Sequence, residues 1–137
     1  MTDSQPVFEP QHDGLDLLRS QVREPVEHVE TFPAPADLTV VRFSTEEVTS
    51  LCPVTGQPDF SGVDLEYGPN GRCIESKSLK LYLWKFRDRQ VFAEALAAEI
   101  AHEVQDRAEP HWVRVTVRQG ARGGISLTAT SELGTRP

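Results

Sequence analysis

Residues 50–60, with the sequence SLCPVTGQPDF, hold a thiol and a carboxylate seven residues apart, at Cys52 and Asp59. Pro53 and Pro58 stiffen this stretch because proline fixes its own φ angle. A thiolate can add to an electrophilic carbon while a nearby carboxylic acid protonates the atom that gains charge, which is the pairing that addition to a nitrile requires. The alternative is a buried, inert cysteine and an aspartate that caps a loop.

A second candidate site is the segment ESKSLKLY at residues 75–82, which lies at the expected start of a helix. Free backbone N–H groups at a helix start, together with two hydroxyls and two lysines, could receive a phosphate. An N-capped amphipathic helix with solvated lysines is the alternative interpretation.

Two weaker candidates follow later in the chain. Glu94 lies in the second expected helix, where its carboxylate could accept two N–H bonds from a guanine-like edge or could simply be solvated. Arg122-Gly123-Gly124 combines a cation with a flexible backbone that could approach a cofactor phosphate, or it could be an ordinary hairpin turn. Cys73 has no acid or base beside it in sequence and is interpreted as structural. The histidines show no metal-ligand spacing with the cysteines, so no zinc site is expected.

The elements that must position these residues follow from hydrophobic periodicity. Strands are expected at residues 38–43 with a continuation toward 48, at 60–67, at 112–117 and at 125–130, and helices are expected at 75–87 and 90–107. This order predicts an α+β domain with an antiparallel four-stranded sheet and two helices on one face. We expect residues 1–35 to be a loosely held arm and residues 36–137 to form the domain. The two open sheet edges favour a homo-oligomer that joins sheets edge to edge.

Composition limits the class of partner. The chain has 137 residues and a formal net charge of −7, from 14 basic and 21 acidic residues. One domain of this size leaves no room for a separate cofactor-binding domain. The acidic balance argues against nucleic acid or a membrane surface as the main partner and favours a small-molecule substrate. The N-terminal residues lack the plan of a secretory signal, and no apolar run approaches membrane-span length, so a cytoplasmic location is expected.

Taken together, these motifs resemble the single-module NADPH-dependent 7-cyano-7-deazaguanine reductases, the nitrile reductases of queuosine biosynthesis, over about residues 43–126. The resemblance rests on four blocks, SLCP at 50–53, TGQPDF at 55–60, ESKSLKLYL at 75–83 and RGGIS at 122–126, and on the spacing between them. It implies a tunnelling fold whose subunits join into barrels, with two rings stacked face to face and active sites between neighbouring subunits.

The resemblance also implies roles for single residues. Cys52 would attack the nitrile carbon to give a thioimide, Asp59 would supply the proton, and two NADPH molecules would deliver hydride in turn. The deazaguanine would contact residues at the positions of Ile74, Glu75, Ser76, Ala93 and Glu94, and NADPH would contact Ser76, Lys77, Arg122 and Gly123. The chain departs from the family at Ala93, where a histidine is usual.

Two other functions compete with reduction. An enzyme on the same scaffold could capture the thioimide with an amine or with water, although archaeal relatives of that type lack the Glu-Ser-Lys-Ser block that this chain carries. A purine- or pterin-binding oligomer without turnover is the other alternative. It would not need both Cys52 and Asp59.

Overall fold

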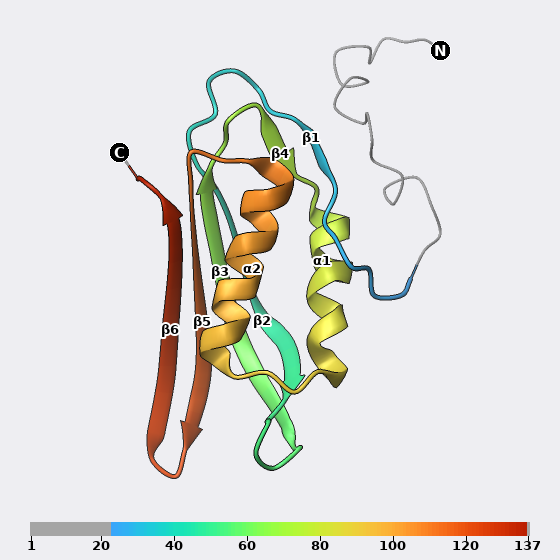
Figure 1. Ribbon diagram of the computed structural model, residues 1–137, viewed down its shortest axis with the longest axis vertical. Coiled ribbons are helices and arrows are strands. Elements are labelled where there is room, and N and C mark those ends of the chain that lie inside the picture. The colour runs from blue at the N-terminus through green and yellow to red at the C-terminus, as the bar shows by residue number, and fades with distance from the viewer. Residues whose placement is uncertain (1–22, 137) are drawn as a thin grey trace.

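The computed structural model describes residues 23–136, which form an antiparallel sheet covered on one face by two helices (Figure 1). The sheet has the strand order β2-β3-β5-β6. Its strands are β2 (Val41–Leu51), β3 (Pro58–Gly68), β5 (Trp112–Arg122) and β6 (Ile125–Gly134), and the helices are α1 (Ser76–Trp84), a 3-10 turn η2 (Lys85–Asp88) and α2 (Ala93–Ala108). The expected α+β class, with two helices on one face, is therefore confirmed.

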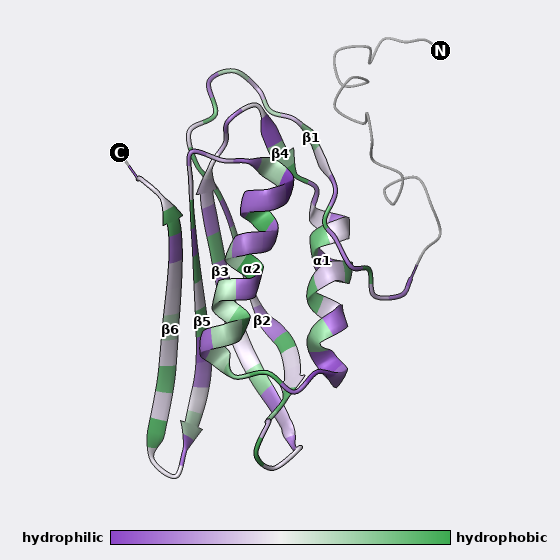
Figure 2. Cartoon of the chain, in the orientation of Figure 1, coloured by the Kyte–Doolittle hydropathy of each residue, from purple (hydrophilic) through white to green (hydrophobic). Residues whose placement is uncertain are grey.

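The core lies between the sheet and the layer formed by α1, η2 and α2. Side chains alternate between the two faces of a strand, so Val63, Leu65 and Tyr67 of β3 all point toward the helices, and each pairs with a buried valine of β5. On α2, the buried residues Leu96 and Ile100 continue the helical period that the sequence predicted. Figure 2 shows the alternation of apolar and polar residues along β6, which leaves one face of the sheet apolar.

The element boundaries differ from expectation mainly next to the candidate site. β2 begins at Val41 instead of residue 38 and runs on to Leu51, immediately before Cys52. α2 begins at Ala93 instead of residue 90, because residues 89–91 pair with the end of β2: the Leu51 N–H donates to the Arg89 carbonyl (2.8 Å), and the Val91 N–H donates to the Leu51 carbonyl (3.1 Å). Backbone pairing thus replaces the first helical turn.

A second, two-stranded sheet was not anticipated. β1 (Thr31–Pro33) pairs with β4 (Arg72–Ile74), each of only three residues, too short for a period-2 pattern to reveal. The buried Tyr67 hydroxyl accepts a 2.7 Å bond from the Ile74 N–H and ties β4 to the main sheet. Between β3 and β4 the chain bends at residues 70–71, where Gly71 takes a φ of +91°.

Part of the expected N-terminal arm, residues 1–22, lies outside the described residues. The remainder packs on the helices: Val29 is buried, and its N–H donates a 2.8 Å bond to the Glu103 carboxylate on α2. The next N–H, of Glu30, donates to Ser78 on α1 at 2.8 Å. From Val29 onward the structure therefore differs from a loosely held arm. In the described part of the chain, no helix combines the length and apolar character that a bilayer crossing needs.

Candidate active site

Three segments that are far apart in sequence meet at one end of the main sheet: the β2–β3 connection, the start of α2 and the β5–β6 hairpin (Figure 1). The pairing of residues 89–91 with Leu51 holds the start of α2 beside the β2–β3 connection. On the other side, Ser61 of β3 pairs with Gln119 of β5, close to the end of the hairpin. This end of the sheet gathers most of the chemistry that the sequence predicted.

The loop that carries Cys52 is closed by its own backbone. The Cys52 N–H donates to the Gln57 carbonyl and the Gly56 N–H donates to the Cys52 carbonyl, each at 2.8 Å, and Gly56 takes a φ of +74° that favours glycine. The thiol is half-buried. The pKa of Cys52 is lowered by a hydrogen bond from the Thr55 side chain and, next, by the backbone N–H groups of Thr55 and Val54, against smaller opposing effects of burial and of the Asp59 charge. The thiolate is the reactive form, so the loop favours a nucleophile.

Asp59 is buried on β3, facing the helix layer, with only 6 % of its surface exposed. A terminal nitrogen of the Arg122 guanidinium lies 2.6 Å from Asp59 Oδ1 and also donates to the Pro58 carbonyl at 3.0 Å. Arg122 and Asp59 of one chain therefore form an ion pair. The resemblance had assigned Arg122 to the cofactor and Asp59 to proton transfer.

Arg122 owes its position to a tight turn. It pairs directly with Ile125, so that Gly123 and Gly124 form a two-residue hairpin loop, with φ angles of +58° and +83°. Positive φ at both central positions is the type I′ arrangement that matches the twist of the two strands. The hairpin expected as an alternative for these residues is present, and it places the Arg122 side chain beside Asp59.

The start of α2 contributes two residues to the same end of the domain. Ala93, the first helical residue, is 2 % exposed and packs in the core, whereas Glu94 is exposed. No side chain caps this helix. Glu94 thus lies exposed in the first helical turn, at the end of the domain that carries the Cys52 loop.

The start of α1 lies elsewhere. Glu75 is buried there and caps its own helix, accepting bonds from the N–H groups of Lys77 (2.8 Å) and Ser78 (2.7 Å). These N–H groups are bound by the cap, as in the alternative interpretation of this segment as an N-capped helix. Ile74 is buried beside Glu75. α1 and η2 separate this group from Arg89 by roughly 20 Å at their usual rise per residue, so one chain does not bring residues 74–77 to Cys52.

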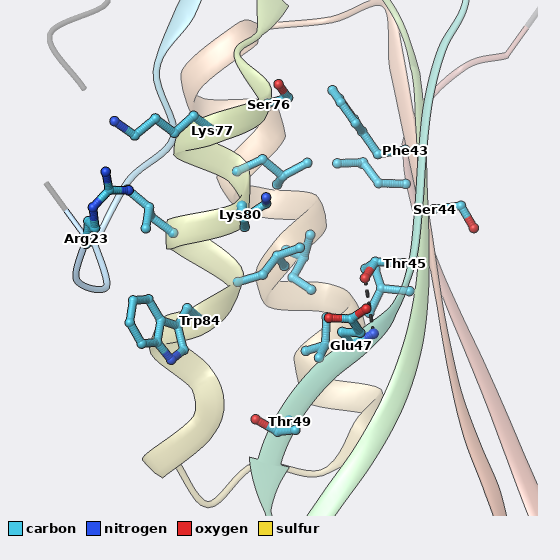
Figure 3. A pocket seen from close by; sticks show the side chains of 17 residues that line it. Arg23, Phe43, Ser44, Thr45, Glu47, Thr49, Ser76, Lys77, Lys80 and Trp84 are labelled. Atoms are coloured by element: carbon cyan, nitrogen blue, oxygen red, sulfur yellow. Dashed lines mark hydrogen bonds between the residues drawn. The ribbon is translucent and has the colours of Figure 1, made fainter. Parts of the chain in front are cut away.

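A cavity of about 850 Å³ lies between α1 and β2. Figure 3 shows Ser76, Lys77 and Lys80 on α1 and Phe43, Thr45 and Thr49 on β2 around it. Its floor is apolar, with residues such as Leu65 and Leu79. Its size falls in the range of small-molecule and cofactor sites, and Ser76 and Lys77 of the predicted cofactor motif both line it.

Sequence reasoning missed two residues at this site. Thr55 entered the sequence analysis only as part of the TGQPDF block. Its side-chain hydrogen bond is the largest cause of the lowered pKa of Cys52. Ser50 stands directly opposite Asp59 in the β2–β3 ladder. The signal for Ser50 was parity, because Ser50 shares a strand face with the apolar, buried Val48. The structural interpretation of Cys73 agrees with its burial, which raises the pKa of its thiol. Within residues 23–136, no group of three or more His, Cys, Asp or Glu side chains could hold a metal ion.

The chain is similar to known proteins over most of its length. The family model described as QueF-like protein matches residues 58–137. A protein of Alkalilimnicola ehrlichii, named NADPH-dependent 7-cyano-7-deazaguanine reductase, is 44 % identical over 111 residues, which cover 80 % of this chain and 86 % of that one. A protein of the same name from Anaeromyxobacter sp. strain Fw109-5 is 42 % identical over 116 residues, covering 83 % and 95 %. Among solved structures, the apo form of the archaeosine synthase QueF-Like superposes with a TM-score of 0.68 at 28 % identity, covering 76 % of this chain and 99 % of that one.

Proposed function

Since this chain belongs to the QueF-like family of NADPH-dependent 7-cyano-7-deazaguanine reductases, we propose that it reduces the nitrile of 7-cyano-7-deazaguanine to an aminomethyl group in queuosine biosynthesis, through a covalent thioimide on Cys52. The single observation that carries the proposal is a thiol whose pKa is lowered and which lies close enough to the buried Asp59 carboxyl to be influenced by its charge, within the SLCP and TGQPDF blocks.

The proposed addition step moves one proton. The sulfur of Cys52 forms a bond to the nitrile carbon, one π bond of the nitrile becomes a lone pair on nitrogen, and Asp59 gives that nitrogen a proton. In the balance of the step, the thiol loses one proton and the nitrile nitrogen gains one. The proton lost by the thiol can therefore reprotonate Asp59. Because Ala93 offers no imidazole at the start of α2, proton transfer is assigned to Asp59 alone.

The residues around the cavity fit the phosphates and ring systems of NADPH. Lys77, Lys80 and Arg23 supply cations at its border in a chain that is acidic overall, and the apolar floor can hold a ring. Two molecules of NADPH would supply the four electrons that separate a nitrile from an amine. The covalent bond to Cys52 keeps the half-reduced carbon from leaving between them.

The complete site is proposed to form between subunits. Residues 74–77 are roughly 20 Å of helix away from the Cys52 end of the same chain, so a neighbouring subunit would provide Glu75, Ser76 and Lys77. Four large apolar side chains are exposed near the Cys52 end: Val54, Phe60, Phe92 and Ile125. Exposed apolar groups that cluster in this way are typical of an interaction surface. The edge strands β2 and β6 would join neighbouring sheets into a barrel.

The proposal is tested by intact-protein mass spectrometry and by NADPH absorbance. Wild-type protein mixed with the cyano-base alone is expected to gain the mass of one substrate molecule, and on adding NADPH it is expected to oxidise two NADPH per base. Cys52→Ala should lose both signals. Cys73→Ala is the matched control, since that thiol is buried and takes no part in the proposed reaction, so both signals should remain. An adduct that survives Cys52→Ala would refute the nucleophile.

Capture of the thioimide by an amine is the second candidate, favoured by the structural likeness to an archaeosine synthase. The relatives at 41–44 % identity, all named reductases, favour reduction. The two functions differ in one measurement: an amine-capturing enzyme forms the adduct but oxidises no NADPH when the cyano-base is supplied.

A further inference from the structure

Ser50 carries a buried hydroxyl with no hydrogen-bond partner among the described residues, and its place in the fold is next to the proposed proton donor. The residue is 1 % exposed, and its Oγ makes no bond. An unpaired buried hydroxyl is costly, so one that persists calls for an explanation. Resting on the proposed function, we propose that Ser50 is a positioning residue that orients the carboxyl of Asp59 during proton transfer to the nitrile nitrogen.

The register of the sheet supports this role. Ser50 and Asp59 are direct partners in the antiparallel β2–β3 ladder, so their side chains lie on the same face with Cβ atoms about 5 Å apart. Burial identifies that face: Asp59 and Ser61 are buried while Phe60 between them is exposed, so all three hydroxyl and carboxyl groups face the helix layer. The Ser50 hydroxyl has three staggered χ1 positions, and we infer that one of them turns it toward the carboxyl of its ladder partner.

In the resting chain, Asp59 already has a partner, because a guanidinium nitrogen of Arg122 lies 2.6 Å from its Oδ1. When the carboxyl carries the proton that it will donate, its charge no longer holds the guanidinium, and the other oxygen needs a donor that keeps the acidic proton aimed at the nitrile. Ser50 supplies that donor. Only the Asp59 proton moves, to the nitrile nitrogen, and the Ser50 hydroxyl keeps its own.

The chain offers a matched control in Ser61. Ser61 is 2 % exposed, lies on the same face of the sheet two residues from Asp59, and also carries a hydroxyl. Unlike Ser50, it has a partner, because the Gln119 side chain donates to its Oγ at 3.2 Å. We therefore expect replacement by alanine to have opposite effects at the two serines, on stability and on the rate of adduct formation.

The first test compares stability with the rate of adduct formation. Ser50→Ala removes a hydroxyl that gains nothing in the resting state, so its unfolding temperature should equal or exceed that of the wild type. Its maximal rate of adduct formation at saturating cyano-base should fall about tenfold, with the half-saturating concentration unchanged. Ser61→Ala should show the reverse: a lower unfolding temperature, because the Gln119 amide loses its acceptor, and a rate within about twofold of the wild type.

The second test is a double-mutant cycle with Asp59→Asn. If Ser50 acts through Asp59, adding Ser50→Ala to Asp59→Asn should not slow adduct formation further, whereas independent effects would multiply. The inference is overturned if Ser50→Ala forms adduct at the wild-type rate, if it loses rate and stability together, or if its effect multiplies with that of Asp59→Asn. A wild-type protein that forms no adduct at all would instead overturn the proposed function itself.

Discussion

Replacement of Arg122 by alanine is expected to destabilise the folded protein by leaving the buried Asp59 carboxylate without its cation. The carboxylate side chain is 9 % exposed and the arginine 54 %, with a nitrogen and an oxygen 2.6 Å apart. Removing one partner of a fully buried pair costs about 3–5 kcal/mol, and exposed pairs contribute about 0–1 kcal/mol. Solvent screens the half-exposed arginine, so the expected cost of removing Arg122 lies between these two ranges, at about 2 kcal/mol.

That free energy corresponds to a loss of roughly 6–10 °C in unfolding temperature for a domain of this size. Calorimetry at one fixed protein concentration measures it, because assembly makes the unfolding temperature depend on concentration. Arg114→Ala is the matched control: its partner Glu132 is exposed, so the change should stay within about 0.5 kcal/mol.

The Asp59→Asn background decides whether the loss comes from the ion pair. With no carboxylate to neutralise, Arg122→Ala should cost much less there than in the wild type, and the difference is the coupling free energy of the pair. An equal loss in both backgrounds would show that Arg122 acts through the hairpin backbone or through packing. In that case, the assignment of Arg122 as the partner of the proton donor would be wrong.

Three further predictions concern single side chains. Thr55→Val removes the largest influence that lowers the pKa of Cys52, so the pKa should rise and the pH profile of adduct formation should move to higher pH, with the rate recovered in alkaline buffer. Lys77→Ala should raise the Michaelis constant for NADPH and leave adduct formation unchanged, and an unaltered constant would place the cofactor elsewhere. Tyr67→Phe removes the acceptor of the Ile74 N–H and should cost about 1–3 kcal/mol in urea unfolding, while a smaller loss would mean that solvent reaches the freed amide.

The sequence alone predicted the chemistry and located the main elements. A thiol and a carboxyl seven residues apart in a proline-stiffened segment indicated nucleophilic addition, and the 3.6-residue and 2-residue periods located both helices and all four long strands. These features are local: hydrophobic periodicity reports which face of an element is buried, and side-chain type reports which reaction a residue can perform.

The tertiary structure decided which of these residues meet. The contact between Arg122 and Asp59 depends on the type I′ turn, which the sequence offered as one of two interpretations, and on the β3–β5 pairing, which leaves no trace in the local pattern. The capping of α1 by Glu75 and the position of Ser50 opposite Asp59 likewise follow from helix phase and strand register. A one-residue slip in register would turn Asp59 to the other face of the sheet, so sequence spacing could propose the partners of this site but only the register could select them.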